Sequence, residues 1–192
     1  MKPAFALVID QERCLGCEAC TVACTLENRT TEHWIRVRTL NALQKDVPEG
    51  RFPDLKLWFR PELCQHCAQP PCAEACPTGA IAKRPDGPVV LETTQCDGCR
   101  LCMEACPYDA IRYNRATDTV EKCHLCVHRI DRGLEPFCVL CCEGQALYFG
   151  DLNDAAGPVS RLLASRKHYR LKPEARTAPS VYYCPPQAPR RL

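Results

Sequence analysis

Short apolar runs recur along the chain at fixed distances from groups of cysteines. An apolar–polar pair precedes a cysteine group, with three residues between them, at Ile9-Asp10, Phe59-Arg60 and Leu91-Glu92. An Ala and a following Ile or Leu come after the last cysteine of a group, with three residues between them, at Ala80-Ile81, Ala110-Ile111 and Ala146-Leu147. This internal repeat predicts units that each contain a short strand, a cysteine loop with a short helix, and a return strand.

Two of the return strands are predicted to begin a β-hairpin. The stretch IAKRPDGPVVLE places Pro85-Asp86-Gly87 at a turn, and AIRYNRATDTVEKC places a bend at residues 114–118. Residues 27–59 interrupt the repeat with one roughly alternating apolar stretch at 34–37, followed by a loop that contains Pro and Gly. We therefore expect an inserted strand and loop there.

Composition points to something bound by the cysteines. The chain has 192 residues, of which 18 are Cys and 7% are aromatic, so a core of ordinary size is not expected to stabilise it alone. The first apolar run, Ala4 to Ile9, is too short for a secretion signal, and no stretch approaches the roughly 20 apolar residues of a membrane helix. We expect a chain that does not itself span a membrane and has no export address of its own, which disfavours a disulfide scaffold. A net charge of +2 gives no argument for nucleic acid.

The tail, residues 155–192, differs from the rest in composition. It carries eight Lys or Arg against one Glu, together with six Pro. An irregular, basic, Pro-rich tail is expected, either as a solvated terminus or as an arm across a partner subunit. Tyr169, Tyr182 and Tyr183 favour the arm, because they provide surface to bury.

The cysteines fall into four groups. Three are the runs CLGCEACTVAC at 14–24, CQHCAQPPCAEAC at 64–76 and CDGCRLCMEAC at 96–106; the fourth is looser, with Cys at 123, 126, 138, 141 and 142. The spacing C-x2-C-x2-C-x3-C is that of bacterial ferredoxins, in which three thiolates hold one [4Fe–4S] cluster and the fourth reaches another. Pro77 and Pro107 follow the last cysteines of two runs and strengthen the match. Zinc is disfavoured, because a structural zinc site needs four ligands, commonly in two pairs, and these runs overfill it.

The crossing rule assigns sixteen cysteines to four [4Fe–4S] clusters. Groups two and three are close in sequence and pair with each other, and groups one and four enclose them. The expected sets are Cys64, Cys67, Cys72, Cys106; Cys76, Cys96, Cys99, Cys102; Cys14, Cys17, Cys20, Cys142; and Cys24, Cys123, Cys126, Cys138. The repeat favours Cys142 over Cys141, which is interpreted as a spare thiol, and the role of Cys184 stays open. The histidines are interpreted as local hydrogen-bonding residues rather than ligands.

The chain shows no convincing catalytic apparatus. It has no Gly-rich phosphate loop, no nicotinamide or flavin fingerprint and no obvious pair of nucleophile and base. Four clusters without a substrate site predict an electron relay rather than an enzyme.

The motifs resemble the four-cluster ferredoxin-like subunits of the dimethyl sulfoxide reductase family of molybdopterin enzymes, and most of all the polysulfide and thiosulfate reductase iron–sulfur subunits. The stretches that carry the resemblance are FRPELCQHCAQPPCAEACPTGAI, CPYDAI, KCHLCVHRI, FGDLND and PSVYY. Glu143 follows the fourth group where Pro is usual. The resemblance implies a large molybdenum or tungsten bis-pterin catalytic partner and a quinone-reactive membrane partner. It leaves two locations open, the cytoplasm or co-export with a signal-bearing partner.

The expected fold is therefore α+β and tandem bacterial-ferredoxin-like, with one two-cluster unit inserted in another. The outer unit is expected at 1–26 and 119–154, the insertion at 27–59, the inner unit at 60–118 and the irregular tail at 155–192. A relay subunit of a tungsten aldehyde-type, formate, hydrogenase or carbon monoxide enzyme, or a free polyferredoxin, is the alternative function.

Overall fold

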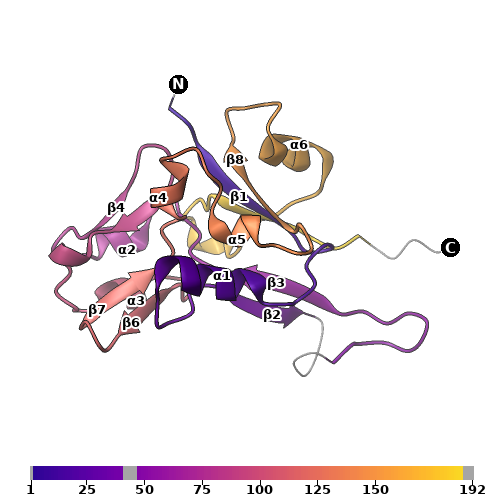
Figure 1. The fold of residues 1–192 in the computed structure, drawn as a ribbon, viewed down its shortest axis with the longest axis horizontal. Coiled ribbons are helices and arrows are strands. Elements are labelled where there is room, and N and C mark those ends of the chain that lie inside the picture. The colour runs from indigo at the N-terminus through magenta and orange to yellow at the C-terminus, as the bar shows by residue number, and fades with distance from the viewer. Residues whose placement is uncertain (1, 41–46, 188–192) are drawn as a thin grey trace.

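The computed structural model describes residues 2–40 and 47–187, and it has mixed α+β architecture with short elements (Figure 1). The strands are β1 (Phe5–Asp10), β2 (Arg36–Leu40), β3 (Trp58–Glu62), β4 (Ile81–Lys83), β5 (Val89–Leu91), β6 (Ile111–Asn114), β7 (Thr119–Lys122), β8 (Leu147–Asp151) and β9 (Val181–Cys184). The helices are α1 (Ala19–Asn28), α2 (Pro71–Glu74), α3 (Leu101–Ala105), α4 (Val127–Ile130), α5 (Phe137–Leu140) and α6 (Pro158–Ser165).

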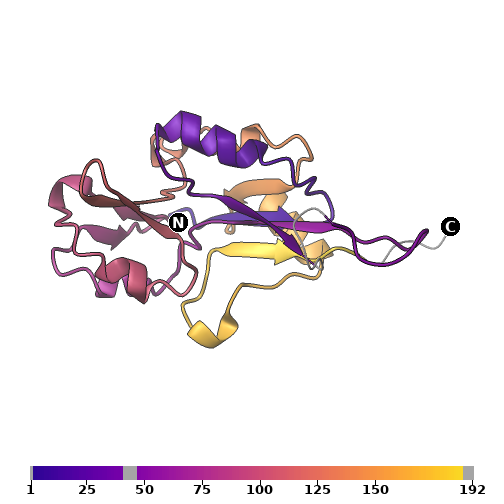
Figure 2. The same cartoon turned by 90° about the horizontal axis from the view of Figure 1, so that it is seen from below.

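A three-stranded sheet with the order β8-β1-β9 forms the centre of the chain. Strand β1 lies in the middle, antiparallel to β8 and parallel to β9, and residues 6–9 of β1 are at most 1% exposed. Helix α1 lies on one side of this sheet (Figure 2). The expected strands around Ile9-Asp10 and Ala146-Leu147 are therefore confirmed, and they pair with each other.

The tail is not irregular, and this expectation was wrong. Residues 158–165 form α6, a 3₁₀ turn follows at Pro173–Ala175, and β9 pairs with β1. Tyr183 is 0% exposed, and Arg166 holds the buried carboxylate of Asp10 at 3.1 Å. Of the three tyrosines that were expected to contact a partner, the chain itself buries Tyr182 and Tyr183 and leaves Tyr169 half-buried. Without β9, β1 would be an unpaired sheet edge.

Both predicted hairpins are present. Strand β4 pairs with β5 across the turn at residues 85–87, and β6 pairs with β7 across the bend that ends at Asp118. The first of these turns contacts the central sheet, where the Phe5 N–H donates to the Asp86 carbonyl at 2.8 Å. The Arg84 guanidinium also pairs with Asp131, at 2.7 Å, beyond α4. These contacts fix the hairpin part of the chain against the sheet.

The inserted strand is β2, and the structure gives it a partner. It pairs antiparallel with β3, the strand that leads into the second cysteine group, from Arg36↔Glu62 to Leu40↔Trp58. Part of the expected loop, residues 41–46, lies outside the described residues. Within residues 2–40 and 47–187, no helix is long and apolar enough to cross a membrane.

Candidate functional site: four cysteine sets

Cys64, Cys67, Cys72 and Cys106, here called the inner central set, line one enclosed space. Cys64 and Cys67 lie in the loop after β3, Cys72 lies in α2, and Cys106 ends α3. Helices α2 and α3 pack against each other, which carries Cys106 from the third cysteine group to the thiols of the second. The structure thus brings together a set that the crossing rule predicted from two separate runs.

The inner terminal set is the reciprocal one: Cys76, Cys96, Cys99 and Cys102 line a second space, walled by Ile81, Leu91 and Val120. Cys102 is buried in α3, whereas Cys99 is exposed. This set therefore lies at the surface of the molecule.

Cys24, Cys123, Cys126 and Cys138 form the outer central set and line a third space. All four are buried, behind a wall that includes Trp34, Ile35 and Leu63. The Asn28 side-chain amide, at the end of α1, approaches Cys24 Sγ at 3.6 Å and Cys126 Sγ at 3.9 Å. Sequence reasoning did not single out Asn28, because an Asn at a helix end is ordinarily a capping residue.

The outer terminal set is Cys14, Cys17, Cys20 and Cys142. Their proximity shows in their electrostatics: after burial, the neighbours that raise the pKa of Cys14 are Cys142 and Cys17. Burial also raises the pKa of Cys20 to about 12, with further contributions from Cys14 and Cys142. Cys17 is exposed, so this set also reaches the surface.

Adjacent Cys141 and Cys142 lie in different surroundings. The Cys142 Sγ accepts a hydrogen bond from the Ala146 N–H at 3.2 Å and acts electrostatically on Cys14 and Cys20. Both cysteines line an open groove beside Glu143 and Tyr148, and within the described residues no contact of Cys141 with another thiol is seen. Cys184 is 0% exposed and packs with Ala6 and Val8 in the cluster beneath α6, apart from the four sets.

Burial makes deprotonation unfavourable for several of these thiols. Burial, together with neighbouring thiols, raises the pKa of Cys24 and Cys72 to about 12 and that of Cys102 to about 11. All 18 cysteines are free thiols. Among the described residues, no three His, Cys, Asp or Glu are arranged to hold a single metal ion. Four thiols around a shared space instead fit the four irons of a cluster, whose positive charge makes their deprotonation favourable.

The four sets follow one another in a row. Cys20 lies close enough to act on the pKa of Cys24 and Cys138, which joins the outer terminal set to the outer central set. Cys64 acts in the same way on Cys123, which joins the two central sets. Cys72 of α2 and Cys76, which follows that helix, belong to different inner sets, as do Cys102 of α3 and Cys106, which follows it. The row thus runs from exposed Cys17, through buried thiols, to exposed Cys99.

The histidines have local partners, as expected. Nδ1 of His66 accepts from the Val89 N–H at 3.0 Å, and Nδ1 of His124 accepts from the Val127 N–H at 3.2 Å. The other three also have polar partners close to their rings: Thr25 for His33, Glu27 for His128 and the Arg166 carbonyl for His168.

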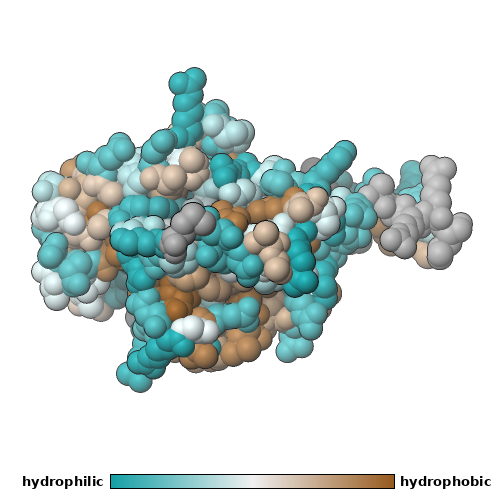
Figure 3. All heavy atoms as spheres, turned by 90° about the horizontal axis from the view of Figure 1, so that it is seen from above, coloured by the Kyte–Doolittle hydropathy of each residue, from teal (hydrophilic) through white to brown (hydrophobic). Residues whose placement is uncertain are grey.

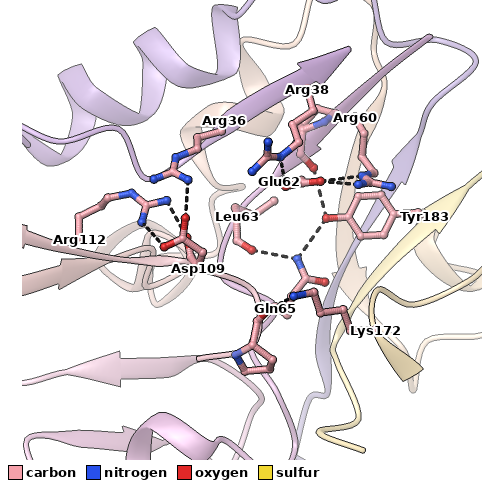
Figure 4. Close-up of polar contacts among 12 residues, drawn as sticks. Arg36, Arg38, Arg60, Glu62, Leu63, Gln65, Asp109, Arg112, Lys172 and Tyr183 are labelled. Atoms are coloured by element: carbon pink, nitrogen blue, oxygen red, sulfur yellow. Dashed lines mark hydrogen bonds and ion pairs between the residues drawn. The ribbon is translucent and has the colours of Figure 1, made fainter. Parts of the chain in front are cut away.

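The tail contributes to the site in a way that sequence reasoning missed. The buried Tyr183 hydroxyl donates to the Pro61 carbonyl at 3.2 Å and accepts from the side-chain amide of Gln65 at 3.1 Å (Figure 4). Gln65 lies in the sequence between Cys64 and Cys67. Thr177, 3% exposed, hydrogen-bonds to Tyr108 at 2.6 Å; its bond to Cys67 opposes the rise in the Cys67 pKa that burial causes. No periodic signal marks these tail positions, so the tertiary structure alone identifies them.

Charged residues fix the inserted hairpin beside the site. Glu62 lies between two guanidinium groups, at 2.7 Å from Arg38 and 2.5 Å from Arg60 (Figure 4). Asp109, in the turn before β6, similarly joins Arg36 of β2 to Arg112 of β6. Ion pairs therefore tie the inserted strand β2 to β3, the strand that leads into Cys64, and to the turn that follows Cys106.

These features define an iron–sulfur protein, and comparison with known proteins places it in a family. A model of the 4Fe-4S dicluster domain matches residues 55–152, and the chain belongs to that family. A tetrathionate reductase subunit of Salmonella typhimurium is 42% identical, over 93% of this chain and 71% of its own length. The arsenate respiratory reductase iron–sulfur subunit of a Shewanella strain is 35% identical, over 93% of this chain and 95% of its own.

A Halobacterium salinarum chain, provisionally named as a dimethyl sulfoxide reductase iron–sulfur subunit, is 39% identical over 93% of this chain and 78% of its own. The expected resemblance is therefore confirmed. The protein is an iron–sulfur electron-transfer subunit, not a catalytic one.

Proposed function

We propose that the chain holds four [4Fe–4S] clusters, one in each cysteine set, and relays electrons between a molybdenum or tungsten bis-pterin catalytic subunit and a second redox partner. The observation that carries the proposal is the grouping of sixteen thiols into the four sets, three of which line enclosed spaces. Each bound cluster would supply one-electron transfer. The residues of the chain hold these groups in a row and exclude water from the central ones.

The two ends of the row are the proposed points of electron entry and exit. Cys17 and Cys99 are exposed, whereas seven of the eight thiols in the two central sets are buried and Cys106 is half-buried. Partners can thus approach the outer terminal set or the inner terminal set. The central sets then serve for passage inside the protein.

The same sets support the tandem arrangement, with an inner ferredoxin-like unit at 60–118 inside an outer unit at 1–26 and 119–154. Each set of the inner unit takes three cysteines from group two or three and one from the other. Each set of the outer unit does the same with groups one and four. Residues 27–59 and 155–192 are additions to this plan.

A large catalytic partner is proposed to bind at the end of the row that carries the outer terminal set. Apolar surface gathers on one side of the molecule in Figure 3. Among the exposed large apolar side chains are Leu15, beside Cys14, and Val22 and Leu26 of α1. The names of the relatives place them in reductases for tetrathionate and arsenate, and this kinship supports a multi-subunit complex. The second partner proposed is a quinone-reactive membrane subunit.

Iron and sulfide analysis of anaerobically purified protein tests the cluster assignment. Four cubanes give about 16 Fe and about 16 acid-labile sulfides per chain. Iron near 12 together with a [3Fe–4S] spectrum, in protein never exposed to oxygen, would overturn the count of four complete clusters.

Affinity purification from the source organism, followed by mass spectrometry and pterin analysis, tests the partner. A large pterin-containing subunit in constant ratio to this chain is expected. Recovery with a hydrogenase or carbon monoxide enzyme, or as a stable monomer, would instead support the alternative functions.

A further inference from the structure

Lys122, the last residue of β7, is a buried cation beside the inner central set. It is 2% exposed, and its side chain lines the enclosed space of Cys64, Cys67, Cys72 and Cys106. Its Nζ lies 3.9 Å from Cys64 Sγ. The amine also donates to the Cys123 carbonyl at 2.9 Å and to the Val89 carbonyl.

These contacts match the three donors of an ammonium group. The two carbonyl oxygens and the sulfur are acceptors, and an ammonium has three hydrogens to give them. Within the described residues, no carboxylate forms an ion pair with Lys122. A buried charge without a counter-ion is costly. The group that can balance it is the cluster with its four thiolates, which together carry about −2.

The two central sets differ in this respect. Both lie in buried, largely apolar surroundings, which disfavour the more negative, reduced form of a cluster. The residues that line the outer central space include no Lys, Arg, Asp or Glu. The Lys122 ammonium faces Cys64 instead, although its neighbour in sequence, Cys123, belongs to the outer central set.

His66 hydrogen-bonds to the N–H of Val89, the residue whose carbonyl accepts from the Lys122 ammonium. Its Nδ1 accepts from the Val89 N–H, so Nδ1 carries no proton, and the carbonyl of the same Val89 accepts from Lys122. His66 has φ +45°, in the left-handed region that favours glycine. The equivalent second position between the paired cysteines of the other groups is Gly16, Gly98 and Leu125, all with positive φ. The left-handed backbone conformation is thus common to all four loops, and the imidazole is particular to this one.

We propose that Lys122 is a positioning residue that raises the reduction potential of the cluster in the inner central set above that of the cluster in the outer central set, with His66 supporting it through Val89. A nearby positive charge favours the reduced state, because reduction adds one negative charge to the cluster. The proposal rests on the proposed function, since it requires clusters in these sets.

The test is an anaerobic redox titration followed by electron paramagnetic resonance, on Lys122→Met, Lys122→Arg and the unaltered protein. Lys167→Met is the matched control, because Lys167 is exposed and its loss removes the same charge. Lys122→Met should lower the midpoint potential of one cluster signal, Lys122→Arg should largely preserve it, and Lys167→Met should leave it unchanged. The signal is assigned as the one altered by Cys67→Ser. His66→Leu, which copies Leu125, should lower the same midpoint by less.

Iron content separates this proposal from the proposed function, which fails if the unaltered protein lacks four clusters. With iron retained, midpoints in Lys122→Met equal to those of the unaltered protein would overturn the role of Lys122. An unshifted midpoint in His66→Leu would overturn the role of His66. If Lys122→Met loses the cluster of the inner central set, retention of that cluster by Lys122→Arg supports a requirement for positive charge. Loss of the cluster in both variants overturns that requirement.

Discussion

The outer and inner parts of the molecule use the same strand–loop–helix repeat but are stabilised differently. The outer part has a three-stranded sheet whose central strand is buried, a 10-residue helix α1, and α6 against the sheet (Figures 1 and 2). The inner part, taken here to include β7 and so to span residues 60–122, has two separate two-stranded hairpins, β4–β5 and β6–β7, and helices of four and five residues. A lone two-stranded hairpin is at best marginally stable in water.

The difference shows what replaces a hydrophobic core. In the inner part the buried apolar side chains are few. One cluster of them consists of Cys72 and Cys102 with Ile81, Val89, Ile111 and Val120. Whatever the thiols bind must therefore hold α2 and α3 to the hairpins. In the outer part the tail adds a strand and a helix, so that the sheet has a core of its own.

The largest expected effect is that of iron removal. Apo-protein should lose protection from hydrogen exchange throughout β4–β7, because metal binding and folding are coupled there. The amides of β1 and β8 should retain part of their protection, because β1 is hydrogen-bonded on both sides. Exchange measured by mass spectrometry on holo- and apo-protein checks this.

Two results on the iron-free protein would contradict this difference between the outer and inner parts. Equal loss of protection in both parts would show that the outer sheet depends on iron as much as the hairpins do. A single sharp thermal transition in fully iron-free protein would show that neither part does.

A smaller effect is expected from the loss of one cluster, and it should depend on the part. Cys142→Ala should lose or convert one cluster and leave the other three, whereas Cys141→Ala should keep all four. Cys102→Ala, in the inner part, should lose more than one, because Cys106 of the neighbouring set directly follows α3. Iron analysis checks all three variants.

Reversed results at the adjacent pair would show that the loop register is wrong by one residue. Equal iron loss in Cys142→Ala and Cys102→Ala would remove the expected difference between the two parts.

Much of this organisation can be predicted from the sequence, because the cysteine loops impose local regularity. The pairs Ile9-Asp10 and Ala146-Leu147 mark strands that are present, and the turns after Lys83 and Asn114 are where the composition places them. Four loops with known spacing leave few ways to form four sets of thiols.

The tail could not be predicted in this way. Val181–Cys184 is a four-residue strand between prolines, and its partner β1 lies more than 170 residues away. Its basic composition suggested a surface arm, yet its apolar side chains are buried by β1 and α6. Lys122 was missed for a related reason: a lone Lys in a strand is ordinarily exposed, and only the fold shows what covers it.

Tyr183→Phe tests the link between the two parts. The Gln65 amide and the Pro61 carbonyl each lose a buried partner, which should destabilise the protein by about 1–3 kcal/mol. The denaturant concentration at which cluster absorbance is lost should fall accordingly. Tyr182→Phe is the matched control in the same strand, since the partner of its hydroxyl is Arg170, an exposed residue. Equal shifts in the two variants would show that the contact with Gln65 has no special role.

The smallest effect is expected where the inserted hairpin meets the inner part, at Asp109. Burial raises the pKa of this carboxyl, but the hydrogen bond from Arg36 and the charges of Arg112 and Arg36 outweigh it, so the pKa lies below 3.8. The carboxylate therefore stabilises the fold above that pH, and its contribution is lost as the pH falls through the lower folded pKa. At neutral pH it is fully present.

Because the Asp109 side chain is 67% exposed, Asp109→Asn should cost only about 0.2–1 kcal/mol. The difference between variant and unaltered protein should shrink in 1 M salt, where charges are screened within about 3 Å. Chemical unfolding at pH 7 in low and high salt measures it, and a difference that salt leaves unchanged would show that Asp109 acts through packing rather than charge.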